Sequence, residues 1–175
     1  MQAPGFVVAA TGLRAEARIA ERTPCVKAIA GGGDETRLAA LIERAIEDGA
    51  RGLISFGIAG ALQPGLQPGA CIVGSAVLFD GNRFATDDAW SAHLLAALPD
   101  ARREAVLGSA SAVGGVDEKA ELNRAAGAAI VDMESHVVAR IAVARGLPFA
   151  VLRIVADNAE QSLPPAAVNG MKPDG

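Results

Sequence analysis

Three acidic residues stand beside predicted strands and helices, where their carboxylates could do chemistry. Glu134 lies at a strand-to-helix junction, Asp157 follows a long apolar strand, and Glu16 lies just past the first strand. Ligands of α/β sheets bind outside the carboxyl ends of the strands, so this placement favours a binding site. There, Glu134 could accept a hydrogen bond from a ligand hydroxyl, Asp157 could donate a proton, and Glu16 could orient a water molecule.

Each of these carboxylates also has a structural interpretation. Glu134 could simply favour the positive N-terminus of the helix that it begins, and Glu16 could be a solvated helix charge. Asp157 could cap a turn together with Asn158. The residue types alone leave both interpretations open.

Gly31, Gly32 and Gly33 precede a predicted helix and form a candidate anion-binding site. Free backbone N–H groups at a helix N-terminus attract negative charge, and a plain tight turn is the alternative. The spacing matches neither a phosphate-binding P-loop nor a dinucleotide-binding motif. We expect His136, one turn into a later helix, to lie at a surface or an interface.

Short β-type runs alternate with helical patterns, which predicts an α/β fold: a mixed, mainly parallel central sheet flanked by helices. Strands are expected at residues 6–10, 26–30, 52–56, 71–79, 104–112, 129–132 and 149–155, and helices at 36–48, 89–98, 118–126 and 134–145. Residues 57–60 should form a glycine-rich turn, and Asp34 should cap the helix at 36–48. No helical pattern follows residue 155, so we expect a missing segment or a neighbouring subunit to cover the last strand.

The composition excludes several classes of protein. With 16 Lys and Arg against 20 Asp and Glu, the net charge is −4, and no basic stretch could bind a nucleic acid. No apolar run approaches the ~20 residues that span a bilayer, so we expect no membrane insertion and a cytoplasmic location. Two widely separated cysteines and two histidines provide no metal site. One domain is expected at residues 1–161, followed by an irregular tail at 162–175.

Three stretches carry a resemblance to a known family. Residues 129–135 read Ala-Ile-Val-Asp-Met-Glu-Ser, and residues 146–157 read Gly-Leu-Pro-Phe-Ala-Val-Leu-Arg-Ile-Val-Ala-Asp. With residues 55–62, Ser-Phe-Gly-Ile-Ala-Gly-Ala-Leu, they resemble motifs of the purine and uridine phosphorylase superfamily, which includes nucleosidases that act on methylthioadenosine and S-adenosylhomocysteine. The resemblance covers nearly the whole chain, which looks most like the hopanoid-associated phosphorylases.

The resemblance implies a role for each acidic residue. Met133 and Glu134 would hold the ribose, with Glu134 accepting hydrogen bonds from its hydroxyls, and Asp157 would protonate the leaving purine at N7. N-glycosidic cleavage passes through an oxocarbenium-like sugar while negative charge moves onto the base, so a proton donor near the base stabilises the transition state. Glu16 matches the acid that activates the attacking water in the hydrolytic relatives.

The resemblance also implies which residues line the substrate. Ala59 and Gly60 would line the sugar and the nucleophile, where the lack of long side chains allows close approach. Relatives carry a base-stacking Phe where this chain has residues 113–116, and Val116 is expected to contact the substrate there. Phosphorolytic relatives place an Arg and a Ser where this chain has Ser55 and Ile58. An apolar Ile58 is typical of the hydrolytic members, although the three glycines and Arg14 could still form a phosphate pocket.

We therefore expect an enzyme, a nucleoside phosphorylase or nucleosidase, that releases adenine from a 5′-modified adenosine. Adenosylhopane, an intermediate of hopanoid biosynthesis, is the leading substrate. A methylthioadenosine or S-adenosylhomocysteine nucleosidase and a non-catalytic nucleoside-binding protein are the alternatives. No cofactor is expected, the nucleophile is water or phosphate as a co-substrate, and the family implies a homodimer.

Overall fold

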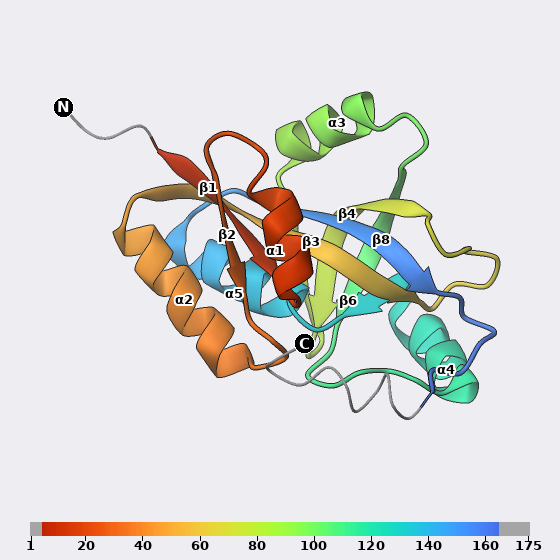
Figure 1. Cartoon of the computed structure of the whole chain (residues 1–175). Coiled ribbons are helices and arrows are strands. Elements are labelled where there is room, and N and C mark those ends of the chain that lie inside the picture. Colours follow the sequence, from red (N-terminus) through yellow and green to blue (C-terminus); the bar gives the residue numbers. More distant parts are fainter. Residues whose placement is uncertain (1–4, 165–175) are drawn as a thin grey trace.

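Eight strands form one mixed sheet in the computed structural model, which describes residues 5–164 (Figure 1). The strands are β1 (Phe6–Thr11), β2 (Val26–Ala30), β3 (Ala50–Ala61), β4 (Cys71–Phe79), β5 (Asn82–Ala85), β6 (Arg102–Gly108), β7 (Ile130–Asp132) and β8 (Phe149–Asp157). The helices are α1 (Arg14–Ala20), α2 (Glu35–Glu47), α3 (Asp88–Ala97), α4 (Val116–Ala126) and α5 (Ser135–Arg145). This arrangement confirms the predicted α/β class, a mixed and mainly parallel sheet flanked by helices.

The strand pairing closes part of the sheet into a ring. β3 pairs with β7 and β8, β8 also pairs with β4, and β6 joins β4 to β7. β1 and β2 extend the sheet beyond β3, and β5 extends it beyond β4. At one end of the ring, Gly60 of β3 lies beside both Val131 of β7 and Asp157 of β8. Three strands thus bring residues from distant parts of the sequence to a single point.

Helices cover both faces of the sheet around β1. Val8 and Ala10 pack into the same buried cluster as α2 and α5, which lie side by side (Figure 1). Ala9 joins a different cluster with Ala20 of α1 and Trp90 of α3. Successive side chains of a strand point to opposite faces, so α2 and α5 cover one face and α1 and α3 cover the other. None of the described helices has the length and apolar character that crossing a bilayer requires.

The structure differs from the predicted elements in a few places. α1 and β5 are additional, because elements of seven and four residues give little periodic signal. Residues 57–60 form no turn: they continue β3, which is held by β7 and β8 on its two sides. The strand predicted at 104–112 lies at 102–108, and residues 109–112 belong to the connection that leads to α4.

Two further expectations are wrong because β8 and α5 lie inside the fold. β8 is not a last strand without cover from its own chain, since it lies between β3 and β4 with α3 and α5 packed against it, although its Ile154 is 39% exposed. His136 of α5 is completely buried rather than at a surface. Its ring stacks on Phe79 at a centroid distance of 4.2 Å, and its Nε2 lies 3.0 Å from Oε1 of Glu35.

Candidate active site

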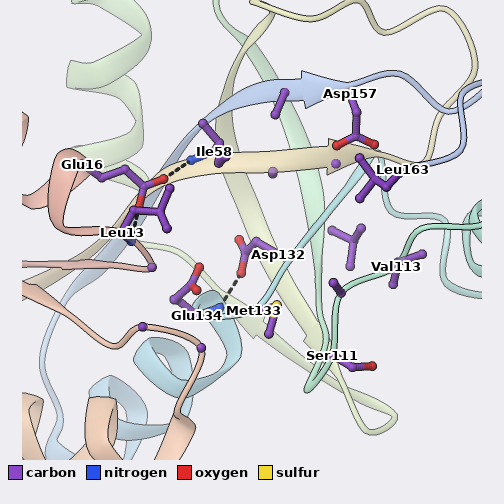
Figure 2. A pocket seen from close by; sticks show the side chains of 18 residues that line it. Leu13, Glu16, Ile58, Ser111, Val113, Asp132, Met133, Glu134, Asp157 and Leu163 are labelled. Carbon is purple, nitrogen blue, oxygen red and sulfur yellow. Dashed lines mark hydrogen bonds between the residues drawn. The ribbon is translucent and has the colours of Figure 1, made fainter. Parts of the chain in front are cut away.

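A pocket of about 280 Å³ opens where the ends of β1, β3 and β8 meet the junction of β7 and α5 (Figure 2). Its acidic lining residues are Glu16, Asp132, Glu134 and Asp157. Most of the remaining wall is apolar and includes Leu13, Ile58, Val113, Val131, Met133 and Leu163. A largely apolar cavity with a few convergent polar groups is the usual form of a small-molecule site.

Asp132, the last residue of β7, caps the N-terminus of α5 by accepting hydrogen bonds from its free backbone amides. Its Oδ1 accepts hydrogen bonds from the amides of Glu134 (3.0 Å) and Ser135 (2.7 Å), and its Oδ2 accepts one from the Ser135 hydroxyl (2.5 Å). Glu134 itself makes no side-chain capping hydrogen bond, and its carboxylate lies at the pocket (Figure 2). Because Asp132 caps the helix, the side chain of Glu134 is left for another role.

The guanidinium of Arg153, which is buried next to the pocket residues Asp132 and Glu134, links these two acidic side chains. Arg153 is completely buried in β8, with Nε 3.0 Å from Oδ2 of Asp132 and Nη2 3.1 Å from Oε2 of Glu134. It also donates to Oγ of Ser55 (2.6 Å) and to the carbonyl oxygen of Ile58 (3.2 Å). A buried cation requires such partners, and their fixed positions orient the Glu134 carboxylate.

The environment of Glu134 raises its pKa to about 7. Burial is the main cause, because it penalises the charged form, and the neighbouring carboxylates of Asp132 and Glu16 act in the same direction. Arg153 opposes the change through its charge and its hydrogen bond. Glu134 is therefore a group that changes its charge near neutral pH, as is common for residues of functional sites.

Glu16 is fixed at another side of the pocket by two backbone amides. Its Oε2 accepts from the amide of Leu13 (2.8 Å) and its Oε1 accepts from the amide of Ile58 (2.9 Å). Close approach is possible because Gly57 has no side chain: a Cβ there would lie 2.5 Å from Oε1 of Glu16. Each carboxylate oxygen can accept more than one hydrogen bond, so Glu16 can still hold a ligand or a water.

Asp157 faces the pocket from the side opposite Glu134 (Figure 2). It ends β8 beside Gly60, and its Oδ2 accepts a hydrogen bond of 2.5 Å from Nζ of Lys119, a completely buried residue of α4. The structure thus brings together the two carboxylates that the sequence separates by α5 and β8. A ligand in the pocket would contact acidic groups at two of its ends.

The other residues that the sequence singled out divide into two groups. Met133, Ala59 and Gly60 line the pocket, whereas Val116 does not: it begins α4 and is 36% exposed. Of the three glycine amides expected to bind an anion, two are not free. The amides of Gly31 and Gly32 donate to the carbonyl oxygens of Thr11 and Gly12, each at 2.9 Å, although Gly32 and Gly33 line the pocket.

Sequence reasoning missed Asp132, Arg153 and Lys119 as members of the site. Arg153 carried a usable signal, since a charged residue within an apolar strand requires a buried partner. Lys119 carried none, because it belongs to the polar run Asp-Glu-Lys-Ala-Glu, which is typical of a solvated helix. Within residues 5–164, no group of three or more His, Cys, Asp or Glu side chains could hold a metal ion.

The ring of strands and its acid-lined pocket define the class of protein, an enzyme of the nucleoside phosphorylase and nucleosidase type. The chain belongs to the Phosphorylase superfamily, whose family model matches residues 29–169. No curated protein sequence matches the chain significantly.

Solved structures of nucleosidases share the fold. A Helicobacter pylori 5′-methylthioadenosine/S-adenosylhomocysteine nucleosidase in complex with a substituted pyrrolidinol that carries an aminopyrrolopyrimidine is 16% identical, with a TM-score of 0.81 over 97% of this chain and 90% of that chain. The Streptococcus pyogenes S-adenosylhomocysteine nucleosidase is 17% identical, with a TM-score of 0.80 over 97% and 89%. A futalosine hydrolase mutant from Helicobacter pylori is 14% identical, with a TM-score of 0.79 over 96% and 94%. At these identities the likeness concerns the fold.

Proposed function

We propose that this protein cleaves the N-glycosidic bond of a 5′-modified adenosine and releases adenine. The observation that carries the proposal is the opposition of Glu134 and Asp157 across one cavity. A nucleoside has hydroxyls at one side and a basic ring nitrogen at the other, so two carboxylates facing each other complement it. The nucleosidase structures that share the fold support the same reaction class.

In this mechanism the two carboxylates act on opposite sides of the breaking bond. Glu134 accepts hydrogen bonds from the ribose hydroxyls and Asp157 donates a proton to N7 of the base. The electron pair of the C1′–N9 bond moves into the ring as the proton arrives, so neutral adenine leaves. General acid assistance of this kind contributes about 10²- to 10⁴-fold in rate.

Water is the proposed nucleophile, oriented by Glu16. The oxygen of the water bonds to C1′, and Glu16 receives the proton that the water loses. Phosphate is less suitable because the described lining of the pocket contains no Lys or Arg, and Arg14 is exposed outside it. The Arg153 guanidinium is already bonded to Asp132, Glu134 and Ser55.

Adenosylhopane is the proposed substrate among 5′-modified adenosines. The apolar wall that includes Leu13, Ile58 and Leu163, and the non-aromatic residues 113–116, suit a bulky apolar 5′ substituent. Methylthioadenosine and S-adenosylhomocysteine are the alternative substrates, favoured by the nucleosidases that share the fold, which are named for these compounds. No cofactor enters this mechanism.

A homodimer is also proposed. Ile58 of β3 lines the pocket and is 39% exposed, and its sheet neighbour Ile154 of β8, which is also 39% exposed, lies beside it, so a second subunit would cover apolar surface next to the site. Exposed apolar side chains that lie next to one another favour a protein interface. Light scattering after size-exclusion chromatography should give twice the chain mass of 17.7 kDa, whereas a single-chain mass would contradict the dimer.

An adenine-release assay tests the proposed function. The substrates are adenosine, methylthioadenosine, S-adenosylhomocysteine and an adenosine with a large apolar 5′ group, each with and without phosphate. Wild-type protein should release adenine without phosphate, and Asp157→Asn should lower kcat about 10²- to 10⁴-fold. Asp100→Asn, at an exposed turn, is the matched control. Tight nucleoside binding with no adenine release by the wild type would instead support a non-catalytic binding protein.

A further inference from the structure

Lys119 of α4 is a buried lysine next to the pocket, and its ammonium group donates three hydrogen bonds. Its side chain is 0% exposed, and Nζ donates to Oδ2 of Asp157 (2.5 Å) and to the carbonyl oxygens of Asn158 and Gln161 (2.8 Å each). A lysine ammonium has three donors, and all three are directed at one short stretch of chain. Burial of a charge is unfavourable unless it is paired and hydrogen-bonded in this way.

These three bonds restrain the orientation of the Asp157 carboxyl group. One oxygen, Oδ2, is held by Lys119, and Oδ1 has no hydrogen bond among the residues that the structure describes. Both carboxyl oxygens lie close to Gly60, where a Cβ would be 3.3 Å from Oδ1. The carboxyl group cannot turn without breaking the Lys119 bond, so the same oxygen remains available to a ligand in the pocket.

The same lysine also fixes the segment that follows β8. The bonds to Asn158 and Gln161 anchor residues 158–161 on α4, and the amide of Leu163 donates to the carbonyl oxygen of Gly114 (2.9 Å). Leu163 lines the pocket. The position of Asp157 and the position of this wall are therefore set by one buried cation.

We propose that Lys119 is a positioning residue for proton donation: it holds Asp157 so that Oδ1 delivers its proton to the leaving base. This inference rests on the proposed function. Before the step Asp157 is the carboxylate partner of Lys119, and its Oδ1 takes up a proton from water as the substrate binds. In the step, the Oδ1–H bond breaks as the N7–H bond forms, the C1′–N9 electron pair enters the base, and Asp157 is again a carboxylate bonded to Lys119. Lys119 does not line the pocket, so it acts on a bound substrate through Asp157.

Replacement of Lys119 should therefore act on kcat through Asp157. A misplacement of about 1 Å at a reacting group can lower a rate about 10²-fold, so Lys119→Met should lower kcat of adenine release about 10- to 100-fold. The KM should change less than kcat: loss of the Lys119 anchor weakens the apolar contact with Leu163, whereas Glu134 and the amide bond of Leu163 to Gly114 remain. Arg124→Met, which removes an exposed cation of the same helix, should leave kcat and KM unchanged.

A double-mutant cycle separates positioning from a purely structural role. If Lys119 acts only through Asp157, the Lys119→Met, Asp157→Asn double variant should be no slower than Asp157→Asn alone. If the loss of kcat in the double variant equals the product of the two single-variant losses, the inference is overturned. If Lys119→Met does not fold, as judged by circular dichroism, Lys119→Gln keeps a donor for the carbonyl oxygens and enters the same cycle. An active wild type with an additive cycle refutes only this inference, whereas a wild type that releases no adenine refutes the proposed function and the inference with it.

Discussion

Replacing Glu134 by Gln removes the buried carboxylate that the site holds at an elevated pKa. The pKa is raised to about 7 from an ordinary value of 4.5, mainly because burial penalises the charged form. The folded protein therefore binds this proton more tightly than the unfolded chain does. The resulting stabilisation is fully present below pH 4.5 and is lost as the pH rises through 7.

The size of this loss follows from the two pKa values. A difference between 4.5 and about 7, at ~1.36 kcal/mol per unit, gives about 3 kcal/mol of folding free energy lost by pH 8. Glu134→Gln carries no such ionisation and leaves Arg153 paired with Asp132. The free energy of unfolding of Glu134→Gln relative to wild type should therefore rise by about 2–3 kcal/mol between pH 5 and pH 8.

Urea unfolding of both proteins at pH 5, 6, 7 and 8 measures this difference. Glu121→Gln on the exposed face of α4 is the matched control, and its difference from wild type should stay nearly constant across the same pH values. A constant difference for Glu134→Gln as well would refute the reasoning, because Glu134 would then ionise alike in the folded and unfolded chains. The variant should at the same time lose ribose binding.

Three further predictions concern the same cluster. Asp132→Asn removes the charge that pairs with buried Arg153 and should lower the free energy of unfolding by about 3 kcal/mol in urea titrations; an effect below 1 kcal/mol would contradict the buried pair. Gly57→Ala introduces a Cβ at a residue with φ +146°, only 2.5 Å from Oε1 of Glu16. The displaced Glu16 carboxylate should lower kcat/KM at least about tenfold. An unchanged kcat/KM would show that Glu16 needs no fixed position. Binding of an uncleavable C-nucleoside analogue of adenosine should tighten about tenfold from pH 6 to pH 8 as Glu134 ionises, and Glu134→Gln should abolish this dependence in calorimetric titrations.

Periodicity and capping residues were sufficient to predict most elements of the fold. The helix at Glu35–Glu47 has buried Leu38 and Ile42 at a spacing of four residues, and Asp34 accepts a capping bond from the amide of Arg37. The continuation of β3 through Gly57 and Gly60 could not be predicted in the same way. Glycine normally indicates a turn, and only the pairing with β7 and β8, which is a tertiary effect, keeps these residues extended.

Site residues could be predicted where they directly follow a strand that the sequence itself indicates. Contacts between side chains that are distant in the sequence could not be predicted. Glu134 and Asp157 follow apolar strands, so their position at one edge of the sheet could be inferred. The amides of Gly31 and Gly32 donate to the carbonyl oxygens of Thr11, the last residue of β1, and of Gly12, and no local sequence pattern encodes these long-range contacts. The Lys119 bond to Asp157 likewise joins residues 38 positions apart.

The structure of the protein with a bound C-nucleoside analogue of adenosine tests the central claim most directly. The account predicts that the ribose hydroxyls lie within hydrogen-bond distance of Glu134 and the base edge within hydrogen-bond distance of Asp157, in one pocket (Figure 2). An analogue that contacts only one of these carboxylates, or that binds outside the pocket, would contradict the claim.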